Sequence, residues 1–264
     1  MTSLRAHVEG IGILGPGLPD WPTARPVLAG ATPHVAGPVV LPPVATLPAA
    51  ERRRVGRAVK LALAAGYEAV AAAGRDPAGL ATVFSSSGAD GDNCHELSQQ
   101  LATSDRQISP TRFHNSVHNV PAGYWGIATG AMAESTALCA FDGSFAAGLI
   151  EAVAQVAVER VPVLLVTYDA SYPEPLRRAR PLTEAFAIAL VLAPEAGPRR
   201  LAAIELALVA EPADVLADAG LEVQRIGAPA ARGLPLLQAI ARGSGGRVVL
   251  DYLPGVQLAV ALLP

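Results

Sequence analysis

The sequence predicts a layered α/β fold in which helices cover both faces of a mixed sheet. Helix-like and strand-like segments alternate early in the 264-residue chain, and strand-like segments dominate later. The run VPVLLVTYD (161–169) is apolar throughout, which is typical of a strand covered on both faces. Because the chain is long enough to bury a large core, we expect a single domain, residues 1–264.

Hydrophobic periodicity and turn residues define the expected elements. Strands are expected near residues 8–14, 80–88, 135–140, 161–169, 185–193, 200–210, 246–253 and 257–264. Helices are expected at residues 47–74, 93–103, 143–160 and 234–243. The segment 109–130 reads as a loop entering a helix, in which Gly123 and Gly126 predict close packing. A proline-rich connection is expected over residues 26–48.

The opening strand contains Gly10-x-Gly12-x-x-Gly15, a formal match to a dinucleotide-binding fingerprint. That fingerprint requires a helix directly after the strand, but prolines occupy three of the next seven positions. We therefore expect no helix soon after Gly15. The prediction is a strand passing into a proline-rich loop, and no cofactor is expected.

Charge and composition exclude several classes of function. The net charge is -3 and the basic residues are scattered apart from the run 51–54 (ERRR), so nucleic acid is not an expected partner. Gly, Pro or charge interrupts every run before the roughly 20 apolar residues that a membrane-spanning helix needs. The start MTSLRAHVEG lacks the features of a signal peptide, so we expect a cytoplasmic protein. Two cysteines, Cys94 and Cys139, cannot build a disulfide framework.

The stretch HNSVHN (114–119) raises the question of a metal site, because His114 and His118 are four residues apart and would face one way on a helix. Further zinc ligands are not evident, since Cys94 and His95 do not match a usual ligand spacing. No metal is expected. A Ser-His-Asp hydrolase is also poorly supported, because the sequence has no G-x-S-x-G elbow.

The stretch FHNSVHNVPAGYWGIATG, followed by STALCAFDGSFAAGLIEA, resembles the N-terminal half of a β-ketoacyl synthase. More closely, the chain resembles the short β-ketoacyl synthase-like chain length factors of aryl polyene gene clusters. GIGILGPG, VFSSSGADG and PVLLVTYD extend the resemblance over most of the sequence. It implies a thiolase-like layered fold in which residues 1–195 match the ketosynthase N-terminal half and residues 196–264 form a reduced C-terminal half.

In a ketosynthase, a cysteine at a helix N-terminus accepts the acyl chain, and two histidines from the second half assist decarboxylation. Aligning Gly143 and Gly148 with the two helix glycines of the family places the nucleophile position on Ala140. Cys139 lies one residue earlier and is a weak nucleophile candidate, which we expect to be buried and inert. No histidine follows His118, so the histidine pair is absent and independent catalysis is not expected.

The resemblance therefore implies a catalytically incomplete partner of a full-length ketosynthase, acting with acyl carrier protein in aryl polyene-type biosynthesis. Its expected role is to limit product length at the shared interface. Six residues are candidates for that interface and for tunnel gating: Phe113, His114, Val117, His118, Tyr124 and Trp125. We favour an interface over a core position for the two large aromatics among them. The alternatives are an independent acyltransferase or thioesterase using Cys139, and a structural homodimer.

Overall fold

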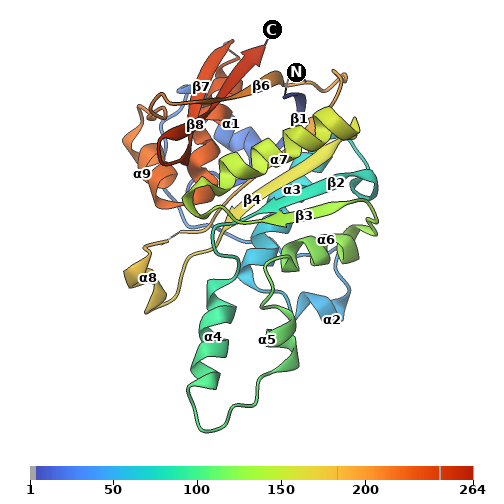
Figure 1. Ribbon diagram of the computed structural model, residues 1–264, viewed down its shortest axis with the longest axis vertical. Helices are drawn as coiled ribbons and strands as arrows, with labels where there is room; N and C mark the ends of the chain where they lie inside the picture. The colour runs from blue at the N-terminus through green and yellow to red at the C-terminus, as the bar shows by residue number, and fades with distance from the viewer. Residues whose placement is uncertain (1–3, 183, 244, 264) are drawn as a thin grey trace.

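The computed structural model describes residues 4–182, 184–243 and 245–263. Its strands form one eight-stranded mixed sheet in the order β3-β2-β4-β5-β1-β6-β8-β7, with helices on both faces (Figure 1). The strands are β1 (Arg5–Leu14), β2 (Ala81–Ser85), β3 (Ser135–Leu138), β4 (Val163–Asp169), β5 (Phe186–Ala193), β6 (Ala202–Val209), β7 (Gly246–Leu253) and β8 (Val256–Leu263). The predicted layered α/β fold is confirmed, and each expected strand forms; Pro264, the last residue of the final predicted strand, lies outside the described residues.

Helices connect and cover these strands. The α-helices are α1 (Trp21–Ala29), α2 (Ala49–Arg52), α3 (Arg57–Ala73), α4 (Gly91–Leu101), α5 (Pro110–His114), α6 (Val120–Thr129), α7 (Ser144–Glu159), α8 (Leu176–Ala179), α9 (Ala219–Gly227) and α10 (Leu234–Arg242). Short 3-10 turns are η1 (Pro77–Gly79), η2 (Phe141–Gly143) and η3 (Pro229–Gly233). β2 pairs in parallel with β3 and β4, and the other strand pairs are antiparallel.

Helix α3 packs very closely on β1, and this contact explains the glycines of the opening strand. A Cβ atom on Gly12 would lie 2.0 Å from the Ala65 carbonyl oxygen, and one on Gly10 would lie 2.1 Å from that of Ala69. Only glycine leaves room for the helix backbone at these two positions. Two of the three glycines of the formal dinucleotide motif, Gly10 and Gly12, therefore serve packing between the strand and the helix, whereas Gly15 makes room for the Phe186 ring of β5.

The opposite face of the sheet is covered by α7, whose Phe145, Leu149 and Val153 are fully buried. The segment Phe141–Glu159 is long and apolar enough to span a membrane, but half of its apolar stretch is buried in the fold. Core helices of folded proteins pass the same test of length and composition. Figure 1 shows α7 lying across the sheet, as expected for a core helix.

Several expectations about helices were wrong in detail. Helix α1 begins six residues after Gly15. Asp20 caps its N-terminus, and Pro22 lies in its first turn. Proline is tolerated there because N–H groups of the first turn form no hydrogen bond within the helix. The predicted helix 47–74 is two helices, α2 and α3, separated by a short break before Gly56. A Cβ atom added to Gly123 in α6 would meet no neighbouring atom within 4 Å, so this glycine is not required for close packing. The short helix α9 was not predicted.

Replacing Gly12 by alanine should lower the free energy of unfolding by about 3 kcal/mol, because the new methyl group overpacks against the α3 backbone. The matched control is Gly123→Ala, where open space and helical backbone predict a gain of about 0.5 to 1 kcal/mol. Urea denaturation of both variants checks the prediction. Equal effects of the two substitutions would contradict the close contact between α3 and β1.

Candidate functional site

The turn between β3 and α7 contains Ala140, the residue that the family resemblance predicts at the nucleophile position. Ser144 holds this turn: its hydroxyl accepts the Ala140 N–H at 3.1 Å and donates to the Phe141 carbonyl at 2.7 Å. Phe141 has a φ of +50°, in the left-handed region that favours glycine. Ala140 has a methyl side chain and offers no thiol or hydroxyl group.

Cys139 is exposed, so the expectation of a buried cysteine was wrong. Its thiol donates to the Ser87 carbonyl at 3.4 Å. The physical reason is its place in the sheet: β3 is an edge strand, and Cys139 follows its last residue, where no neighbouring strand covers it.

Two arginines from later parts of the chain converge on this turn. Arg180 follows α8 and donates to Asp142 at 2.7 Å, and Arg232 in η3 donates to the other carboxylate oxygen at 3.1 Å. The Arg180 guanidinium also lies over the Phe141 ring, 3.7 Å from its centroid. Guanidinium groups donate hydrogen bonds but neither accept them nor exchange protons at neutral pH. Two permanently charged guanidinium groups, both paired with the Asp142 carboxylate, therefore lie at this turn.

Asp169 is a buried carboxylate at the end of β4 that joins three segments of the site. Its Oδ1 accepts the Ser87 N–H at 2.9 Å and the Ser87 hydroxyl at 2.6 Å. Its Oδ2 accepts the Ala230 N–H at 2.8 Å. Burial raises the pKa of Asp169 to about 6, although these three donors favour the charged form.

The histidines of HNSVHN do not share a helix. His114 is the last residue of α5, whereas His118 lies in the following turn with its Nε2 3.2 Å from the Ser86 carbonyl. Asn115 between them is buried; its amide donates to the Arg54 carbonyl at 2.8 Å and accepts from the Tyr124 hydroxyl at 3.3 Å. The segment thus connects α6, β2 and the break before α3. In the described part of the chain, no group of three or more His, Cys, Asp or Glu residues is placed to hold a metal ion.

The six predicted interface residues fall into two groups. Phe113 and Val117 are 67% and 53% exposed, and His114 is also exposed. They line a groove of about 520 Å³. Tyr124 packs beneath the edge of the His114 ring and borders the same groove.

Trp125 is 1% exposed, with its ring centroid 4.9 Å from that of Tyr67. Tyr124 is 2% exposed. The preference for an interface over a core position was therefore wrong for both residues, because α6 turns this side towards the core between α3 and the sheet. His118 is partly buried by its contact with the loop after β2.

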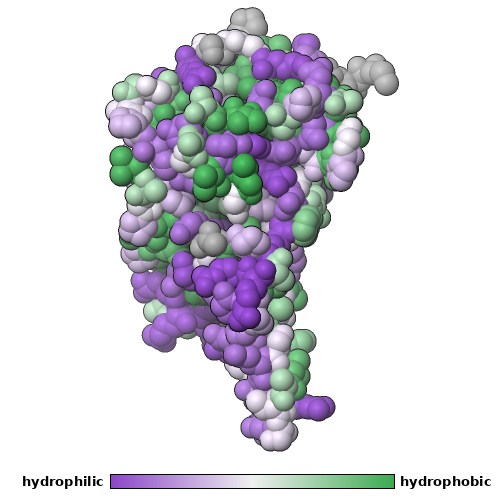
Figure 2. All heavy atoms as spheres, turned by 90° about the vertical axis from the view of Figure 1, so that its left-hand side faces the viewer, coloured by the Kyte–Doolittle hydropathy of each residue, from purple (hydrophilic) through white to green (hydrophobic). Residues whose placement is uncertain are grey.

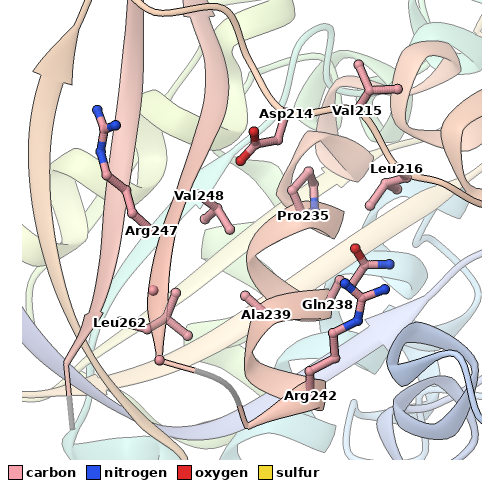
Figure 3. A pocket seen from close by; sticks show the side chains of 12 residues that line it. Asp214, Val215, Leu216, Pro235, Gln238, Ala239, Arg242, Arg247, Val248 and Leu262 are labelled. Atoms are coloured by element: carbon pink, nitrogen blue, oxygen red, sulfur yellow. The ribbon is translucent and has the colours of Figure 1, made fainter.

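Another cavity, of about 260 Å³, lies between α10 and the β7–β8 hairpin (Figure 3). Its described lining contains no serine, cysteine or histidine. The Asp214 carboxylate, which points into it, accepts the Val249 N–H at 2.9 Å and so covers part of the free edge of β7.

The sequence alone did not indicate the roles of Asp142, Asp169, Arg180 and Arg232. Asp142 was visible only as an acidic residue near a helix N-terminus, and Asp169 as the end of a strand. The two arginines carry no local signal at all, because the segments that bring them to the turn are about 40 and 90 positions further along the chain.

Asp169→Asn should change the pH dependence of stability. The pKa of Asp169 is about 6 in the folded protein against an ordinary value of 3.8. The folded state therefore binds this proton more tightly than the unfolded chain, and the stabilisation is complete below pH 3.8 and lost as the pH rises through about 6. The difference between the two pKa values corresponds to about 3 kcal/mol in the free energy of unfolding.

Between pH 4 and pH 7 the wild-type free energy of unfolding should fall by about 3 kcal/mol relative to that of Asp169→Asn, measured by urea denaturation at each pH. Other titrating groups, including Glu68, whose pKa burial raises to about 7, are common to both proteins and cancel in the comparison. Parallel pH profiles would contradict the raised pKa.

Comparison with known proteins agrees with this architecture. The chain is similar to a chain in the structure of the complex between the ketosynthase ApeO and its chain length factor ApeC from Xenorhabdus doucetiae, with a TM-score of 0.74 and 21% identity over 97% of this chain and 99% of that chain. It is also similar to the ishigamide ketosynthase/chain length factor, with a TM-score of 0.73 and 12% identity over 98% and 99%. A β-ketoacyl synthase from Burkholderia phymatum STM815 gives a TM-score of 0.59 and 17% identity over 89% of this chain and 70% of that one.

The TM-scores show a shared thiolase-like fold, as predicted, and the length of the chain is consistent with a reduced C-terminal half. No curated protein sequence matches the chain. The family model described as the β-ketoacyl synthase N-terminal domain matches residues 28–244. Since that match spans most of the sequence, the chain belongs to the β-ketoacyl synthase N-terminal domain family.

Proposed function

We propose that this chain is a catalytically incomplete chain length factor that pairs with a full-length β-ketoacyl synthase. The observation that carries the proposal is the composition of the turn between β3 and α7: Ala140, which the family resemblance aligns with the nucleophile, has no reactive group, and Arg180 and Arg232 bind the neighbouring Asp142. No histidine follows His118 in the sequence. Condensation requires both a nucleophile and groups that stabilise the developing charge of the decarboxylated unit, so the partner would supply the chemistry.

The shape of the chain supports pairing. Helices α4 and α5 form an arm that projects from the body in Figure 1 and narrows to a tail in Figure 2. Only Gly91 and Asn93 of α4 are buried, which is unusual for a helix with a partner inside its own chain. The edge strand β3 leaves backbone hydrogen-bonding groups free on its outer side. Such an arm and edge suit contact with a second subunit.

The groove lined by Phe113 and Val117 suits a steric limit on product length. Its apolar lining also includes Ile127, which is 52% exposed. In the proposed complex, these side chains would close the far end of the partner's acyl tunnel. Each unit added beyond the available volume would cost on the order of 1 to 3 kcal/mol in overpacking. Product length would then depend on side-chain volume at this groove.

Several finer features belong to the same proposal. The complex would accept its growing chain from acyl carrier protein and would act in the cytoplasm in aryl polyene-type biosynthesis. Residues 1–195 would act as the ketosynthase-like half, and residues 196–264 as the reduced half within a single domain. The structure of ApeO with ApeC, and that of AntDE with the type II acyl-carrier protein AntF, at a TM-score of 0.74, 11% identity and 99% coverage of both chains, support this choice by analogy.

A second candidate, independent acyl transfer by Cys139, is favoured by one observation, the exposure of this thiol. Incubating the isolated chain with an acyl thioester and recording its intact mass tests it. A covalent adduct that disappears in Cys139→Ala would establish this activity, whereas an unmodified mass would eliminate it.

Co-expression with the ketosynthase encoded nearest to this chain is the direct test of pairing. We expect a stable one-to-one complex by size-exclusion chromatography with light scattering. We also expect condensing activity that survives Cys139→Ala in this chain and is lost when the partner's nucleophile is replaced. A folded chain that elutes without the ketosynthase, alone or as a homodimer, would refute the proposal.

Phe113→Ala should lengthen the products of the reconstituted pair by opening the groove, as measured by mass spectrometry of the released chains. Ile226→Ala on α9, which is 63% exposed and remote from this groove, is the matched control and should leave the product distribution unchanged. An unaltered distribution in Phe113→Ala would remove this residue from tunnel gating.

A further inference from the structure

Phe141 is an exposed aromatic residue held in a strained backbone conformation. Its side chain is 63% exposed, and its φ of +50° is one that residues with a side chain rarely adopt. Both features are unfavourable in an isolated chain. Strained residues concentrate at functional positions, where the surrounding structure holds them in place.

The surrounding structure does hold Phe141. The Arg180 guanidinium covers one face of the ring at 3.7 Å, at the distance of a cation-π contact. Arg180 is in turn fixed by Asp142, which Arg232 also contacts. The side chains of the two arginines are only 18% and 19% exposed, so this support is anchored within the fold. One face of the ring is fixed, and the ring remains open to a partner.

The ring borders a cavity with an apolar rim. This cavity has a volume of about 450 Å³ and is also lined by Tyr252, Leu253 and Pro254 at the β7–β8 turn. Leu253 is 44% exposed. The exposed apolar surface therefore continues from Phe141 to the hairpin, and it begins at the end of the edge strand β3.

We propose that Phe141 is a pre-positioned anchor that is buried against an apolar surface of the ketosynthase subunit. This inference rests on the proposed function. We assign the ketosynthase as the partner because Phe141 follows β3, the edge strand proposed for pairing. One surface of the partner would therefore cover both Phe141 and the edge of β3. Rigid aromatic side chains at the centre of interfaces carry a large share of binding energy, since little conformational freedom is lost on association.

The test is the dissociation constant of the co-expressed complex. Phe141→Ala should weaken association by about tenfold or more, and Phe141→Tyr should retain wild-type affinity. Val223→Ala is the control: this α9 residue is an apolar side chain that is 70% exposed, and α9 is not a neighbour of β3 in the sheet. Its affinity should equal that of the wild type.

Arg180 is a positioning residue in this proposal, and a double-mutant cycle measures that role. Arg180→Met should weaken association less than Phe141→Ala, and adding it to Phe141→Ala should cause no further loss. Additive losses would assign Arg180 a separate contact and overturn its positioning role. Phe141→Gly should raise the melting temperature of the isolated chain, because glycine adopts the positive φ without strain.

The outcomes separate this inference from the proposed function. A wild-type complex whose affinity is unchanged by Phe141→Ala would overturn the anchor and leave the pairing intact. Absence of any wild-type complex would refute the proposed function itself. A homodimer that dissociates in Phe141→Ala would assign the anchor to a second copy of this chain and overturn the choice of partner.

Discussion

The contact between β1 and α3 is the constraint on which the rest of the fold depends. β1 lies inside the sheet, paired with β5 along one part of its length and with β6 along another. In the sheet, β1 lies between β5, the last strand before residue 195, and β6, which pairs with the β7–β8 hairpin. Glycine at positions 10 and 12 lets the backbone of α3 pack directly against this central strand.

The turn between β3 and α7 is held by charged groups from distant parts of the chain. Ketosynthase chemistry needs a thiolate and groups that bind a developing negative charge. Here the turn carries a methyl group at Ala140, and the later parts of the chain deliver permanently charged guanidinium groups that are bound to Asp142. The ion pair between Arg232 and Asp142 connects the later part of the chain to this turn, and the pair between Arg180 and Asp142 fixes the turn from within residues 1–195.

Polar residues that suggest a metal or proton-transfer site serve here as structural connections. Asn115 and His118 bind backbone carbonyls from two other segments, and Asp169 binds backbone and side-chain donors around the same loop after β2. Buried polar groups of this kind are stable only when they are hydrogen-bonded, which restricts the loops they join to one arrangement. The same connections position the exposed groove at Phe113 relative to the sheet.

The sequence by itself determined the strands, the two long helices and the absence of a histidine pair, because periodicity and composition are local properties of the chain. Family resemblance added the position of Ala140. Only the tertiary structure decided that Cys139 is exposed, that Trp125 belongs to the core, and that Arg180 and Arg232 meet at Asp142. Those outcomes depend on which strand lies at the edge of the sheet and on contacts between distant segments, and no local pattern of residues encodes either.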